Sequence, residues 1–143
     1  MKDTLTQMYQ RLRSVERTRV YIYILVYFVW GVLMNYIGIL TEIAKFTHWW
    51  QIVPTYIFYM VPISILLKEY NFFTQYAYGL VAMGVLEFGG YALQTSYIYP
   101  NNILDRTFGS HVFALGMALF FASYFPLGNT IVNKFYHHII DKK

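Results

Sequence analysis

A carboxyl group within an apolar segment is the feature of this sequence that most clearly could do chemistry. Glu87 lies in the middle of "GVLEFGGYALQ" (residues 84–94), and none of its neighbours there is charged. A charged residue at the centre of a membrane helix costs about 2.5–3.5 kcal/mol on insertion scales, so it is expected to face a bundle interior or a wet cavity. We therefore expect Glu87 to have a functional role. The alternative is a protonated structural acid that donates a hydrogen bond to Asn35.

Small and polar residues recur at helical spacing in two segments, which places each set on one face of a helix. The two sets are Gly31, Asn35, Gly38 and Glu42 in the first segment and Gly84, Glu87, Tyr91 and Gln94 in the third. Two such faces can pack against each other, because glycines allow close approach and amides hydrogen-bond between helices. Taken alone, Asn35 and Gln94 are therefore better explained by packing than by ligand binding.

The second apolar segment predicts how a cavity would form beside these faces. Its stretch "PTYIFYMVP" places two tyrosines between Pro54 and Pro62. A proline inside a helix kinks the axis and frees a backbone carbonyl. Apolar, aromatic walls with a few convergent polar groups are typical of small-ligand sites. The predicted ligand-binding residues are Asn35, Tyr56, Tyr59, Glu87, Tyr91 and Gln94.

Catalytic and metal sites are weaker hypotheses. An acid–base pair would need Glu87 to converge with Tyr91 or His111 on one substrate position, which makes these three the candidate catalytic residues. His48 and His111 open the second and fourth apolar segments and are weak candidates for a metal or haem site. The histidines match no metal-binding or haem-attachment motif, so we expect no metal and no cofactor.

Composition and patterning indicate the elements that position these residues. The chain has 143 residues, of which 57% are hydrophobic and 13% charged, against roughly a quarter charged in soluble domains. Four apolar segments, at about 20–41, 49–67, 72–99 and 110–132, have the roughly 20 residues that a membrane-spanning helix needs. Short connections leave one domain over 1–143. The sequence therefore predicts an all-α integral membrane protein built as a four-transmembrane-helix bundle.

Positive charge predicts the orientation of this bundle. Most Lys and Arg residues precede the first segment or follow the fourth, which places both termini in the cytoplasm of a multi-pass protein of the cell membrane. Apolar residues at helical spacing in 1–19 predict a cytoplasmic amphipathic helix, and 133–143 reads as a basic cytoplasmic tail. The net charge of +4 favours anionic lipid as a partner rather than nucleic acid. The absence of cysteine excludes disulfides and thiolate sites.

Three functions are compatible with these features. The first is binding, or transport, of a lipophilic or amphiphilic small molecule in an intramembrane cavity around Glu87. The second is an integral-membrane enzyme that acts on a lipid or isoprenoid-like substrate with Glu87 as general acid or base. The third is an accessory or assembly subunit whose polar faces dock onto a second copy or onto a larger membrane complex. The burial cost of Glu87 favours the first.

Overall fold

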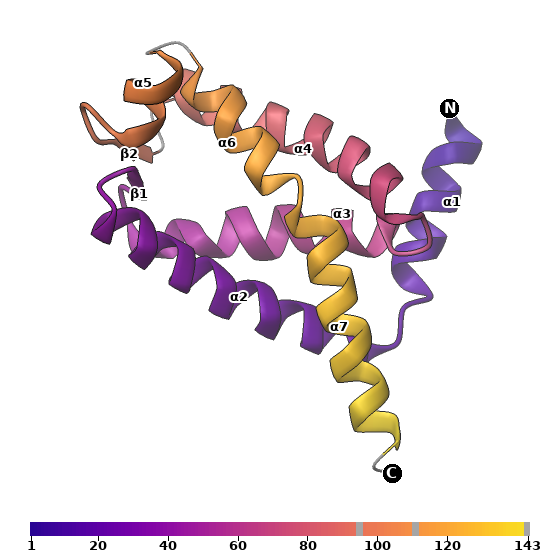
Figure 1. The fold of residues 1–143 in the computed structure, drawn as a ribbon. Coiled ribbons are helices and arrows are strands. Elements are labelled where there is room, and N and C mark those ends of the chain that lie inside the picture. The colour runs from indigo at the N-terminus through magenta and orange to yellow at the C-terminus, as the bar shows by residue number, and fades with distance from the viewer. Residues whose placement is uncertain (94–95, 110–111, 142–143) are drawn as a thin grey trace.

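Helices dominate the structure, a computed structural model that describes residues 1–93, 96–109 and 112–141 (Figure 1). The helical share is 81%. Within the described residues, three helical stretches are long and apolar enough to cross a membrane: Arg17–Leu40, Trp49–Leu67 and Phe113–Ile140. The prediction of a mostly helical chain with long apolar helices is thus confirmed, and these stretches indicate a multi-pass membrane protein.

The N-terminal segment contains a separate helix, α1 (Lys2–Arg13), followed by α2 (Arg17–Leu40). The two are joined at Ser14, whose hydroxyl donates to the carbonyl of Arg11 at 3.0 Å, and at Glu16, whose backbone is extended. The predicted helix over 1–19 is therefore shorter, because this turn redirects the chain. In Figure 1, α1 lies beside the end of α3 and runs across it, while Leu12 and Val15 pack on the core.

The second apolar segment is helical but changes its winding along its length. It begins as the 3-10 helix η1 (Trp49–Gln51), continues as the π-helix η2 (Val53–Met60) and ends as α3 (Val61–Leu67). Pro62 cannot donate to the carbonyl of Phe58, four residues earlier, which removes one α-helical hydrogen bond at the π–α junction. The π-helical stretch contains Pro54 and ends before Pro62, and the predicted kink stays a prediction.

The third apolar segment ends earlier than predicted. Helix α4 runs over Phe72–Leu93, and the chain then forms the strand β2 (Ser96–Ile98), which pairs antiparallel with β1 (Ala44–Phe46). The register places Ala44 opposite Ile98 and Lys45 opposite Tyr97. The prediction of a helix over 72–99 in an all-α fold is wrong here. Aromatic and β-branched residues favour extended backbone, and the short β1 strand supplies their hydrogen-bonding partner.

Glycine on α2 lets this strand pair approach the helix. After α2 the chain turns back at Glu42, which has φ 53°, and the amide of Ile43 donates to the carbonyl of Gly38 at 3.0 Å. A Cβ atom on Gly38 would collide with the carbonyl oxygen of Ala44. The β1–β2 pair can therefore pack against the end of α2 only because residue 38 has no side chain.

A short helix, α5 (Ile103–Phe108), connects β2 to the fourth apolar segment. Asn102 caps it, because its Oδ1 atom accepts from the amides of Leu104 and Asp105 at 3.1 and 3.0 Å. Gly109 ends it with φ 97°, a conformation that favours glycine. The β1–β2 pair and α5 lie at the end of the molecule opposite α1 in Figure 1.

The fourth apolar segment is divided into α6 (Phe113–Phe121) and α7 (Tyr124–Asp141). The break precedes Pro126, whose ring would clash with the carbonyl of Ala122 in a continuous helix. Helix α7 continues well beyond residue 132, so the described part of the predicted basic tail is helical, and its cytoplasmic position stays a prediction. Contacts with α2 hold this extension: Arg19 donates to Asn133, and the Tyr136 hydroxyl donates to Glu16.

Candidate functional site

A cavity of about 360 Å³ lies between α2, η2, α4, α6 and the β1–β2 pair. Its volume is in the range of small-ligand sites, and most of its walls are apolar. Its lining includes Met34, Asn35 and Gly38 from α2, Ala44–Phe46 and Ile98 from the strands, Tyr56 and Met60 from η2, Met83, Leu86 and Glu87 from α4, and Phe113, Gly116, Met117, Phe120 and Phe121 from α6.

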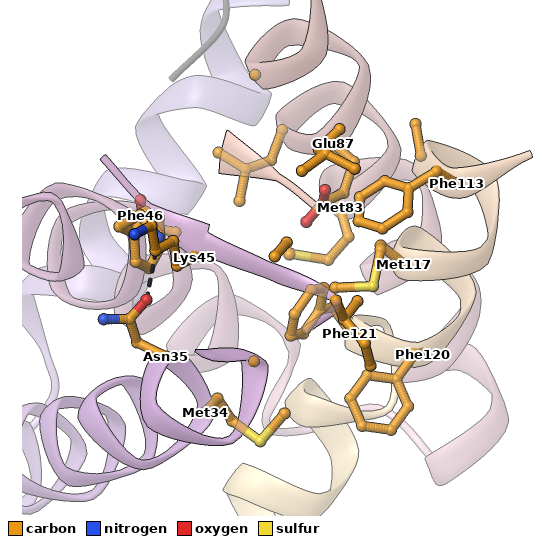
Figure 2. A pocket seen from close by; sticks show the side chains of 18 of the residues that line it. Met34, Asn35, Lys45, Phe46, Met83, Glu87, Phe113, Met117, Phe120 and Phe121 are labelled. Atoms are coloured by element: carbon orange, nitrogen blue, oxygen red, sulfur yellow. Dashed lines mark hydrogen bonds between the residues drawn. The ribbon is translucent and has the colours of Figure 1, made fainter. Parts of the chain in front are cut away.

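Among the described residues, Glu87 is the only acidic residue of this lining. Figure 2 shows its carboxyl group beside Met83 at the cavity wall. In the part of the chain that the structure describes, no hydrogen bond or ion pair reaches this carboxyl group. Glu87 is half-buried, and a carboxyl group at an apolar cavity wall without a protein partner is available to contact a ligand.

Asn35 lines the cavity, but its partner is not Glu87. Its Oδ1 atom accepts from the backbone amide of Phe46 at 3.0 Å, as the dashed line in Figure 2 shows. The structure does not contain the hydrogen bond from Glu87 to Asn35 that the sequence analysis considered, because Asn35 is directed to β1. Asn35 instead holds the strand pair against the end of the cavity.

The two tyrosines of η2 have different positions. Tyr56 is buried and lines the cavity, with its ring packed against Gly31, where a Cβ atom would lie 2.8 Å from Tyr56 Cδ2. Tyr59 is absent from the cavity wall, because its hydroxyl donates to the carbonyl of Ala82 on α4 at 2.6 Å. Only Tyr56 of this predicted pair is placed to contact a ligand.

Lys45 is a lining residue that the sequence analysis did not select. It carries the second charge of the cavity wall, and its Nζ atom lies 5.6 Å from the ring centroid of Tyr97 and 5.9 Å from that of Tyr99. Such distances are typical of cation–π contacts. The pairing of β1 with β2 creates this arrangement, and neither strand was predicted.

Four predicted candidate residues remain: Tyr91, Gln94, His111 and His48. The side chain of Tyr91, and both Gln94 and His111, lie outside the described residues. His48 is exposed at the start of η1, and its ring stacks on Trp50 with 5.7 Å between centroids. Among the described residues, no group of three or more His, Asp or Glu side chains is arranged to hold a metal ion.

A buried polar cluster lies away from the cavity and was missed by sequence reasoning. Its centre is Asn129 on α7, whose Nδ2 atom donates to Gln75 Oε1 at 2.7 Å and to the Ser64 carbonyl at 3.1 Å. The Tyr23 hydroxyl donates to Asn129 Oδ1, and the Tyr27 hydroxyl lies 2.5 Å from Ser64 Oγ. The cluster joins α2, α3, α4 and α7. Asn129 within an apolar segment is the signal that indicates it.

Comparison of this chain with protein-family models, with curated proteins and with solved structures found no significant match. The geometry of the cavity therefore carries the functional argument by itself.

Proposed function

We propose that this protein binds a lipophilic or amphiphilic small molecule in the cavity around Glu87. The observation that carries the proposal is the Glu87 carboxyl group, which faces an apolar cavity of about 360 Å³ without a partner in the described part of the chain. Ligand sites in membrane bundles combine apolar walls with a few polar groups that fix orientation. Glu87 is the group that would orient the ligand.

The membrane arrangement that best fits this function has four crossings, with α4 as the third crossing along the chain. Helix α4 has 22 residues, enough for about 33 Å at 1.5 Å per residue. With α4 inserted, both termini lie on the cytoplasmic side, where the basic residues before α2 and on α7 are favoured. In this arrangement the cavity lies in the outer half of the bilayer, where lipid-soluble molecules can reach it. Transport would require the same site to become accessible from both sides.

Native mass spectrometry of the protein purified in mild detergent tests the proposal. We expect the wild-type protein to retain a small molecule whose mass identifies its class, and we expect Glu87→Gln to retain less of it. Glu69→Gln is the matched control, since Glu69 is an exposed carboxylate between α3 and α4, away from the cavity lining.

A variant that fills the cavity tests ligand binding without changing the charge of the lining. Gly116 lines the cavity, and a Cβ atom there would meet no atom within 4 Å. A side chain at this position therefore starts in open space, and Gly116→Leu should occupy ligand space and displace the retained molecule. Gly89→Leu is its control, because Gly89 on α4 also has open space but is not part of the lining. The proposal would be contradicted if the wild-type protein retained no small molecule and formed an oligomer that dissociates in Glu87→Gln. Glu87 would then be an assembly contact.

A further inference from the structure

We propose that the ligand of this cavity is a lipophilic monocation, such as a protonated alkylamine, whose positive charge pairs with the Glu87 carboxylate. This inference rests on the proposed ligand-binding function and specifies the chemical class of the ligand. It follows from the charges, the ring faces and the size of the cavity.

The charge of the lining gives the first argument. Glu87 is its only acidic residue, and among the described residues no cationic side chain pairs with it. Glu87 is half-buried, and a carboxylate beside apolar walls attracts an opposite charge more strongly than one in open water does. The protein provides the anionic half of an ion pair in this cavity, and a ligand with a positive charge completes it.

The walls around the carboxyl group give the second argument. Five aromatic side chains line the cavity: Phe46, Tyr56, Phe113, Phe120 and Phe121. Aromatic ring faces attract cations, and this attraction reaches about 2 kcal/mol or more when the cation is desolvated. Met83 and Met117 in the lining add polarizable thioethers, whose sulfur atoms are weak acceptors. These groups stabilise a positive charge and its alkyl substituent better than they stabilise an anion.

Lys45 is the group that could oppose this preference. Its ammonium group contacts the rings of Tyr97 and Tyr99 on β2, so a cation–π interaction holds this charge at the strand-covered end of the cavity. If Lys45 rather than Glu87 selected the ligand, the cavity would prefer an anionic amphiphile. The two charges therefore predict opposite ligand preferences, and the experiment below distinguishes them.

The volume sets the size of the ligand. A cavity of about 360 Å³ holds about a dozen water-sized groups at about 30 Å³ each. An amine with an eight-carbon chain fits this space. Octylammonium, 1-octanol and octanoate are matched probes, because they share the chain length and differ in the charge of the head group at pH 7.

The test measures the apparent Kd of each probe from the shift of the thermal unfolding midpoint of the full chain in one detergent. For the wild-type protein we expect octylammonium to bind at least about tenfold more tightly than 1-octanol, because hydrogen bonds to charged groups are stronger than neutral ones. In Glu87→Gln this ratio should fall to about one, whereas Glu69→Gln should keep the wild-type ratio. Gly116→Leu should weaken the binding of all three probes. Any shift of the unfolding midpoint that remains in this variant measures the effect of the probe on the micelle.

Each of the other outcomes contradicts the proposed ligand class, and the last of them also contradicts ligand binding itself. Equal binding of 1-octanol and octylammonium, abolished by Gly116→Leu, would leave ligand binding intact and remove the charge preference. Tightest binding of octanoate would assign ligand selection to Lys45 and overturn the inference. A preference for octylammonium that persists in Glu87→Gln would also overturn it. If none of the three probes binds to the wild-type protein, the proposed ligand-binding function fails together with the inference.

Discussion

Asn129 on α7 and Gln75 on α4 are joined by a buried hydrogen bond, with 2.7 Å between Asn129 Nδ2 and Gln75 Oε1. Asn129→Leu removes this bond and leaves the Gln75 carbonyl and the Tyr23 hydroxyl without their partner. We expect a loss of about 1–3 kcal/mol in the free energy of unfolding, because unsatisfied buried polar groups are costly. Denaturant unfolding in mixed micelles measures this loss. Thr130→Ala, at an exposed neighbouring position, should change little; equal losses in both variants would contradict the role of the cluster.

Gly128 on α7 lies against the hydroxyl group of Tyr27 on α2, where an added Cβ atom would collide with the phenol. Gly128→Ala should therefore lower the free energy of unfolding by about 1–3 kcal/mol through overpacking. Combining it with Tyr27→Phe removes the colliding oxygen, so the loss should be smaller than the sum of the two single losses. Gly84→Ala is the control, because Gly84 has open space. Additive losses would show that the two residues do not contact each other.

Asn35 connects α2 to β1 through one hydrogen bond to the amide of Phe46. Asn35→Ala removes the acceptor, while Asn35→Asp keeps an acceptor oxygen. Because a hydrogen bond contributes about 0.5–1.5 kcal/mol, we expect amide hydrogen exchange in residues 43–47 to rise about two- to tenfold in the alanine variant. Exchange in α7 should stay unchanged. If both variants protect this region as the wild-type protein does, the strand pair does not depend on Asn35.

The proposed four crossings place Glu69 and Thr107 on opposite sides of the membrane, because α4 lies between them in the chain. The natural chain contains no cysteine, so Glu69→Cys and Thr107→Cys can be labelled singly in intact cells with an impermeant reagent. Both positions are exposed. We expect labelling of Thr107→Cys from outside and of Glu69→Cys only after permeabilisation. Labelling of both from the same side would show that α4 does not cross.

Hydropathy predicted the helices well, because apolar length is a local property of the sequence. Helix α2 begins and ends within three residues of the predicted segment 20–41. The strand pair could not be predicted in this way: β1 and β2 are short and separated by the second and third apolar segments, and "SYIY" continues an apolar run. The extension of α7 beyond residue 132 makes contacts with Arg19 and Glu16, which are even more distant in the sequence.

The candidate site could be predicted in part, because some of its residues stand out locally in the sequence. Glu87 was found because a carboxylate is rare in an apolar segment, and Asn35 because its spacing from two glycines places it on their face. Tyr59 does not line the cavity. Its segment is a π-helix, whose i→i+5 hydrogen bonds change the angle between successive side chains, and the sequence does not indicate this winding. Lys45 enters the site only through strand pairing, which no helical pattern indicates.

The pairing of β1 with β2 also fixes the order in which the cavity is built during synthesis. Strand β1 (Ala44–Phe46) leaves the ribosome about fifty residues before β2 (Ser96–Ile98), and α6, which forms another wall, follows later still. Until then β1 has no strand partner, because the contacts that close a long loop form only after the loop exists. Closure of the cavity is a late event in biogenesis, and the first helices enter the membrane before the site exists.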